Sequence, residues 1–246
     1  MIKTEQKNGY VHLLISRPEK KNALTRDMYQ DLADGVEKAA ADESVNAIVI
    51  SGDGGVFTAG NDLDDFRARA TDTNPRPSAG LAFIETLMNC DTPVIIAAEG
   101  LAIGIGTTML LHVDTVYAGQ STRFKTAFVD LGLVPEAAST VTMPLHLGSR
   151  KAADLLLMGD VLTAVEAADI GLITRSVEDG EALNQAFEAA EKLATKPRGA
   201  LRASKRLMKA PWQAMVKEAL ERERDVFGER LRSDDCHAAL ARMGKK

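Results

Sequence analysis

Residues 100–119, GLAIGIGTTMLLHVDTVYAG, contain a glycine-bearing turn, a helical segment and a strand in one run. The residues before them, 93–98, have the apolar, β-branched composition of a buried strand. Gly104 and Gly106 can turn backbone amides toward a ligand at the start of a helix over 105–112. The alternative is that the two glycines only allow close packing of the helix on a sheet. Met109 stands where a dinucleotide fingerprint needs a third glycine, so such a site is not indicated.

The same alternation of strand and helix extends on both sides of this run. Residues 2–6 and 10–16 flank Asn8-Gly9, which favours a hairpin turn. Thr25 can cap a helix that leads to a strand at 46–51. From residue 181 onward the sequence is almost wholly helical. We therefore predict an α/β core over 1–197 and a helical C-terminal part over 198–246.

Composition narrows the class of protein. The chain has 246 residues, 30 Lys and Arg against 35 Asp and Glu, and 4% aromatic residues, so we expect no nucleic-acid partner. Cys90 and Cys236 lie far apart, and neither they nor the histidines have metal-ligand spacing, so we expect no metal site. No targeting signal is visible, and the most apolar stretch, 93–113, is interrupted by Glu99 and glycines. We predict a cytoplasmic protein that does not enter the membrane.

Glu136 is a lone carboxylate in the uncharged stretch LVPEAAST, 133–140. With Pro135 at the first helical position, it is typical of a residue that stabilises the positive end of a helix. In an apolar pocket the same carboxyl would have a raised pKa, which suits a general acid or base near neutral pH. The local sequence leaves both interpretations open.

Three loops, 57–63, 100–108 and 128–136, each follow a predicted strand, and α/β proteins build their sites at strand ends. The quoted run and the motifs RPEKKNAL, FTAGNDL and FVDLGLVPEAAST occur in the order and spacing of the enoyl-CoA hydratase/isomerase family, which they resemble over nearly the whole chain. The resemblance implies the crotonase fold, a spiral of β-β-α units with a helical C-terminal region that supports oligomers.

The resemblance also implies a site for an acyl-CoA thioester, with coenzyme A present only as part of the substrate and no permanently bound cofactor. The backbone amides of Asn61 and Ile105 would hold the thioester oxygen, a role in which their side chains matter little. The remaining expected substrate or coenzyme A contacts are Lys20, Lys21, Ala23, Ala59, Gly60, Asp62, Leu63, Phe66, Gly104, Gly106, Thr108 and Phe128.

Departures from the hydratase pattern select a branch of the family. Hydratases of this family carry two glutamates where this chain has Thr108 and Phe128. Glu136 instead matches the single catalytic glutamate of the Δ3,Δ2-enoyl-CoA isomerase branch. Moving a double bond needs removal of a C2 proton and its return at C4, which one carboxylate can perform. We therefore predict isomerase chemistry with Glu136 as the acid/base residue.

Several alternatives stay open at this stage. The nearest alternative reaction is hydration of a 2-enoyl-CoA, with Asp130 or another residue replacing the glutamates. Dehalogenation or thioester hydrolysis would need a nucleophile or a positioned water molecule, and no residue is singled out for either role. A non-catalytic acyl-CoA-binding protein is a rival of another class. Asp62 is expected to be a helix cap or loop anchor, and Asp130 a surface charge. The loop 71–80 is a candidate lid, and the resemblance implies a homotrimer or a dimer of trimers.

Overall fold

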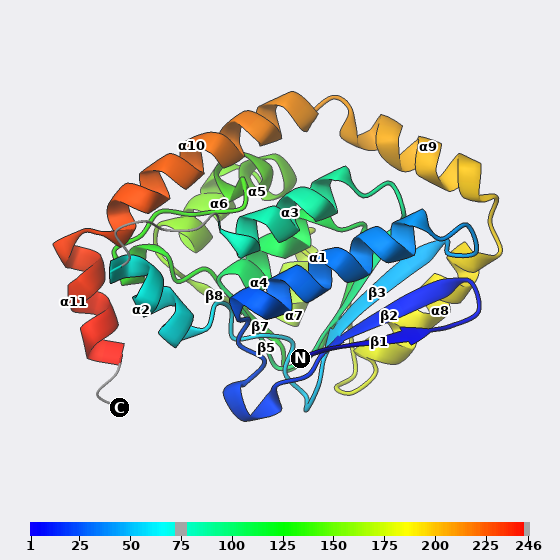
Figure 1. The fold of residues 1–246 in the computed structure, drawn as a ribbon, viewed down its shortest axis with the longest axis horizontal. Helices are drawn as coiled ribbons and strands as arrows, with labels where there is room; N and C mark the ends of the chain where they lie inside the picture. Colours follow the sequence, from blue (N-terminus) through cyan, green and yellow to red (C-terminus); the bar gives the residue numbers. More distant parts are fainter. Residues whose placement is uncertain (72–77, 244–246) are drawn as a thin grey trace.

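Six strands form the main sheet of the computed structural model, which describes residues 1–71 and 78–243. The first two strands pair antiparallel across Asn8-Gly9, as predicted, and the others join in parallel in the order β1-β2-β3-β4-β6-β9 (Figure 1). These strands are β1 (Ile2–Gln6), β2 (Tyr10–Ile15), β3 (Ala47–Gly52), β4 (Val94–Ala98), β6 (Thr115–Gly119) and β9 (Arg175–Val177).

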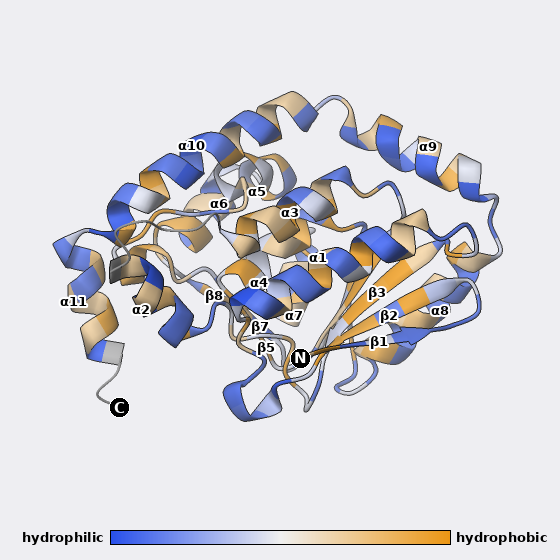
Figure 2. Ribbon diagram, viewed as in Figure 1, coloured by the Kyte–Doolittle hydropathy of each residue, from blue (hydrophilic) through white to orange (hydrophobic). Residues whose placement is uncertain are grey.

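Helices cover both faces of this sheet, because successive side chains of a strand point to opposite sides. Ile48 and Ile50 belong to the larger core cluster with side chains of α1 (Arg26–Ala41) and α3 (Ala79–Asn89). Ala47 and Val49 point the other way, against α8 (Ala182–Ala194). The apolar strands β2 and β3 stand out between these layers in Figure 2. As predicted, the Thr25 side chain caps α1 by accepting a hydrogen bond from the Met28 amide.

A second, smaller sheet lies beyond the end of β4. It contains β5 (Leu101–Ile103), β7 (Arg123–Lys125) and β8 (Val161–Thr163) in that order. The sequence patterns did not predict these three-residue strands, which are too short to show an alternation. The strand β8 leads into α7 (Ala164–Asp169), which begins with a capping box between Thr163 and Glu166.

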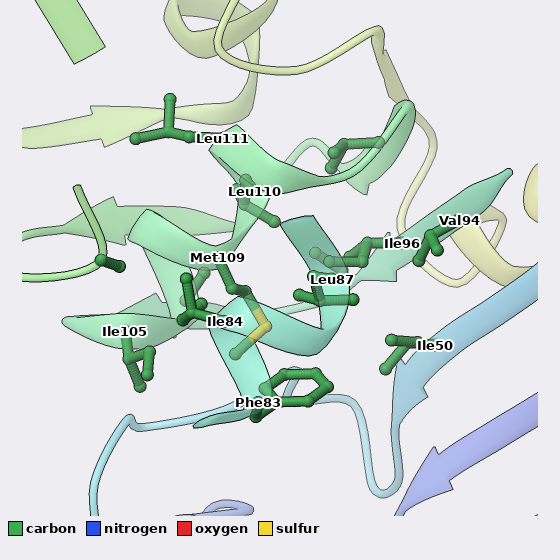
Figure 3. Close-up of a cluster of buried hydrophobic side chains, with 14 of the residues drawn as sticks. Ile50, Phe83, Ile84, Leu87, Val94, Ile96, Ile105, Met109, Leu110 and Leu111 are labelled. Carbon is green, nitrogen blue, oxygen red and sulfur yellow. The ribbon is translucent and has the colours of Figure 1, made fainter. Parts of the chain in front are cut away.

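The segment expected as one helix over 105–112 has two parts. α4 (Ile105–Thr108) is followed by a 3-10 helix over Met109–His112. Ile105 and Met109 are fully buried in the core beside Phe83, Ile84 and Leu87 of α3 (Figure 3). The buried side chains hold the start of α4 firmly, which matters for the site that begins there.

The C-terminal helices fold back over the body. α10 (Gln213–Leu231) crosses the molecule and α11 (Asp234–Met243) lies beside α2 (Leu63–Thr71) (Figure 1). The rings of Phe66 on α2 and Phe227 on α10 meet edge to face, with centroids 6.1 Å apart. The other helices are α5 (Ser139–Leu147), α6 (Ser149–Leu156) and α9 (Arg198–Lys209). No helix among residues 1–71 and 78–243 has the length and apolar character needed to cross a membrane.

This mixed α/β architecture confirms the predicted fold class. α9 begins at Arg198 after the long helix α8, and both the division of the chain at residue 197 and the role of the C-terminal helices in oligomer formation stay predictions. Most of the candidate lid, residues 72–77, lies outside the described residues. The last residues of that stretch belong to a helix and not to a loop, because Ser78 caps α3 and the helix begins at Ala79.

Candidate active site

Two glycine-containing loops meet where β5 begins. The amide of Thr58 donates to the Leu101 carbonyl at 2.9 Å, and the amide of Ile103 donates back to the Thr58 carbonyl at 3.1 Å. A Cβ atom on Gly60 would lie 2.6 Å from the Ile103 oxygen, and one on Gly106 would lie 2.6 Å from the Thr58 methyl group. Close packing is therefore one reason for glycine in these loops, and it brings Asn61 and Ile105 to neighbouring positions.

The backbone amides of Asn61 and Ile105 lie on the two loops and are unused as donors in the described part of the chain. The residues on either side of Asn61 are both hydrogen-bonded to Leu24. The Leu24 amide donates to the Gly60 carbonyl, and the Asp62 amide donates to the Leu24 carbonyl. Gly104 has φ 58° and ψ −119°, a conformation open to glycine, and it places Ile105 at the first position of α4. Among the described residues, neither amide donates a backbone hydrogen bond. Two free donors on adjoining loops suit a developing negative charge.

The N-terminal loop RPEKKNAL is tied to the same place by buried Asn22. The side-chain amide of Asn22 donates to the backbone carbonyls of Asp53 and Val56. The backbone carbonyl of Asn22 accepts from the Thr58 hydroxyl at 2.7 Å. The Ala59 amide donates to the Lys21 carbonyl at 2.9 Å. This loop therefore lies beside the site. Of its residues that are predicted to contact coenzyme A, Lys20 and Lys21 are exposed and Ala23 is half-buried.

Glu136 does not belong to a helix, so its interpretation as a first-turn charge is wrong. Ala137 and Ala138 adopt left-handed backbone conformations with φ of 63° and 54°, and α5 begins only at Ser139. The two alanines reverse the chain and leave Glu136 in the segment before them. Its side chain is only 5% exposed. Left-handed alanines cost energy that the surrounding structure must offset, as is common at functional sites.

Burial raises the pKa of Glu136 to about 7 from its usual 4.5. The nearby charge of Glu223 adds to the rise, while Arg69 and a side-chain hydrogen bond from Asn61 oppose it. The Oε1 atom of Glu136 is buried without a hydrogen-bond partner among the described residues. A carboxyl with this pKa and a free oxygen can both take and return a proton near neutral pH.

Asn61 places its side chain at the site as well as its backbone amide. The Tyr29 hydroxyl donates to Asn61 Oδ1 at 2.7 Å. Burial and the charge of Glu136 raise the pKa of Tyr29 well above its usual value, so the phenol keeps its proton as a donor. This orients the amide nitrogen of Asn61 toward Glu136. Sequence patterns did not indicate Tyr29.

The other candidate carboxylates are occupied elsewhere. Asp62 accepts from the amides of Asp64 and Asp65 at the start of α2 and from Arg17 at 2.6 Å, so it is the predicted cap and anchor. Burial raises the pKa of Asp62, but these hydrogen bonds outweigh it and the net shift is downward. Asp130 is exposed and pairs with Lys125 at 2.8 Å, as expected for a surface charge.

A cavity of about 480 Å³ opens beside Asn61 between α1, α2 and α3. Tyr29 and Phe66 are in its walls, and contact of Phe66 with the substrate stays a prediction. Thr108 and Phe128 are both buried and bring no carboxylate to the site, while Leu63 faces outward at the start of α2. Arg69, which no sequence pattern indicated, also lines this cavity.

Comparison with known proteins shows the family of the chain. The enoyl-CoA hydratase/isomerase family model matches residues 5–245. Enoyl-CoA delta isomerase 2 from Rattus norvegicus is 32% identical over 97% of this chain, which spans only 62% of that relative. The 1,2-epoxyphenylacetyl-CoA isomerase from Escherichia coli is 31% identical over 91% of this chain and 87% of its own length. The solved structure of Pseudomonas aeruginosa OdaA has a TM-score of 0.95 and 39% identity, covering 100% of this chain and 99% of that one.

Proposed function

Since the chain belongs to the enoyl-CoA hydratase/isomerase family, we propose that it moves the double bond of a 3-enoyl-CoA to C2, with Glu136 as the acid/base residue. One observation carries the proposal: Glu136 is buried, its pKa is raised to about 7, and its Oε1 atom has no partner among the described residues. A group in this state is suited to carry one proton between two carbon atoms.

The reaction needs no group beyond those at the site. The thioester oxygen accepts hydrogen bonds from the amides of Asn61 and Ile105, and Glu136 removes a proton from C2. The electron pair of that C–H bond forms the C1–C2 double bond of a dienolate, whose negative charge rests on the thioester oxygen. Collapse of the dienolate forms the C2–C3 double bond, while the former alkene electrons take the same proton from Glu136 at C4.

The magnitudes fit this mechanism. A positioned base contributes about 10²- to 10⁴-fold to such a step. Each amide aimed at the developing oxyanion contributes about 3 kcal/mol. Asn61 joins the two parts of the site, because its backbone serves the oxyanion and its side chain, held by Tyr29, bonds to Glu136.

Hydration of a 2-enoyl-CoA needs a second group to orient the water molecule. Thr108 and Phe128 replace the two glutamates that serve this purpose in hydratases, as the sequence motifs imply. Glu223 is a second buried carboxyl whose charge acts on Glu136. Its Oε1 atom accepts hydrogen bonds from the amide and hydroxyl of Thr140 at the start of α5, while its Oε2 atom has no hydrogen-bond partner among the described residues. The replacement of both hydratase glutamates supports the isomerase reaction, and Glu223 is the first group to test if water addition is seen.

The test is an assay of the purified protein with 3-hexenoyl-CoA and, separately, 2-hexenoyl-CoA. Double-bond migration and water addition are followed by chromatography and mass spectrometry. We expect migration by the parent and its loss in Glu136→Gln, with Glu221→Gln as an exposed control on α10. Water addition alone would make the protein a hydratase. Turnover that survives in Glu136→Gln would mean another group carries the proton, and no turnover with tight acyl-CoA binding would favour a non-catalytic protein.

A further inference from the structure

Arg69 is a half-buried arginine in the cavity beside Asn61, and the proposed reaction does not use it. Its Nη1 atom donates to the Ser78 hydroxyl at 3.1 Å. Its Nε atom is buried and has no hydrogen-bond partner among the described residues. No carboxylate in the described part of the chain lies within 4.0 Å of the guanidinium group.

A guanidinium group in this position calls for an anion. Arginine keeps its charge in proteins, and a buried charge without a counter-charge is costly. The acidic residues of the cavity are engaged elsewhere, because Asp62 binds Arg17 and Asp65 accepts from the backbone amide of Arg26. The charge of Glu136 acts on Arg69, but the two groups do not form a contact ion pair. The cavity therefore has a positive group and space for a negative one.

The orientation of the guanidinium group indicates the shape of that anion. Because Nη1 is held by Ser78, an anion in the cavity would approach the opposite edge, which carries Nε and Nη2; Nε is covered by neighbouring atoms and has no hydrogen-bond partner among the described residues. This edge of arginine presents two parallel N–H donors, which match the two oxygens of a carboxylate. The position is also suitable, since the cavity adjoins the amide of Asn61 where the thioester oxygen would bind.

We propose that Arg69 binds a carboxylate on the acyl group, so that the preferred substrates are mono-CoA thioesters of unsaturated dicarboxylic acids. This inference rests on the proposed function for the place of the thioester. A phosphate of coenzyme A offers the same oxygen chemistry to Arg69, and the experiment separates the two sources. The role is one of substrate selection, and Glu136 keeps the proton transfer.

Binding is measured first, with adipoyl-CoA and hexanoyl-CoA, which differ only in a terminal carboxylate against a methyl group. Calorimetry with the parent protein should show tighter binding of adipoyl-CoA. Arg69→Met should weaken adipoyl-CoA by about 10- to 100-fold, the size expected for a hydrogen-bonded charge, and leave hexanoyl-CoA unchanged. Arg69→Lys should lie between the two because an ammonium group cannot form the paired contact.

Arg67→Met is the matched control. It removes the same charge from α2, but Arg67 pairs with Asp64 and lies outside the cavity walls. An equal loss in Arg67→Met and Arg69→Met would reduce the effect to long-range attraction and overturn the proposal. A different result would be that Arg69→Met weakens the binding of adipoyl-CoA and hexanoyl-CoA equally and leaves the binding of the corresponding pantetheine thioesters unchanged. That result would assign Arg69 to a coenzyme A phosphate and would also overturn the proposal.

Turnover of 3-hexenoyl-CoA and of 3-hexenedioyl mono-CoA then separates this inference from the proposed function. Assays at about pH 9 keep Glu136 ionised in every variant, so that the electrostatic influence of Arg69 on it does not enter. The parent should favour the dicarboxylic substrate, and Arg69→Met should lose that preference. If neither substrate is isomerised while the difference in binding persists, the proposed function fails and the carboxylate site stands. If both are isomerised without a preference, the carboxylate site fails alone.

Discussion

Glu136→Gln should make the protein more stable at alkaline pH, although it removes the proposed catalytic group. In the unfolded chain this carboxyl ionises near its usual pKa of 4.5, and in the folded protein burial raises the pKa to about 7. Between these values the folded protein holds a proton that the unfolded chain has released. The free energy of unfolding therefore falls as the pH rises through this window.

The magnitude follows from the two pKa values. The difference between 4.5 and about 7 corresponds to about 3 kcal/mol, at about 1.4 kcal/mol per pH unit. That stability is fully present below pH 4.5 and fully lost above about pH 7. Glutamine has nearly the same shape and no charge at either pH. The variant should therefore exceed the parent by about 3 kcal/mol at high pH, or about 5–10 °C in Tm for a chain of this length.

The measurement is urea or thermal unfolding of both proteins at about pH 4.5, the lower edge of the titration window, and at about pH 8, above it. The quantity to compare is the change in the stability difference between the two pH values, since other carboxylates titrate alike in both proteins. Glu221→Gln on the exposed side of α10 serves as the control and should show no such change. A stability difference that is the same at both pH values would refute the argument, because Glu136 would then ionise normally despite its burial.

Three further predictions concern the reaction and the two loops. Isomerase kcat/KM should fall about tenfold per pH unit below about 7, because Glu136 must be ionised to take the C2 proton, and a pH–rate profile that is flat down to pH 4.5 would contradict this. Tyr29→Phe removes the 2.7 Å bond to Asn61, so kcat should fall about 2- to 10-fold with little change in KM; parent-like kinetics would show that Asn61 is held by other groups. Gly60→Ala adds a Cβ atom 2.6 Å from the Ile103 oxygen at φ 89°, so it should cost about 2 kcal/mol in denaturant unfolding and most of the turnover, and a stable, fully active variant would disprove that constraint.

Local sequence patterns determined much of the secondary structure. The apolar run within 46–51 predicts a short buried strand, and the structure confirms it as β3, packed between α1 and α8. The cap at Thr25 was also predicted correctly, since capping depends on residues a turn apart. Short strands such as β5 escaped prediction because they are held by the neighbouring β7 and by Thr58, not by a pattern of their own.

The motifs likewise indicated which loops contribute to the site, and they identified Glu136 as a candidate. They could not decide between a helix-stabilising charge and a buried acid/base residue, because both interpretations fit Pro135 and the uncharged neighbours. That decision required the tertiary structure. The pKa of Glu136 depends on burial and on Asn61, Arg69 and Glu223, which come from distant parts of the chain. The sequence specifies which carboxyl is available, and the fold decides its proton affinity, because desolvation and charge act through space.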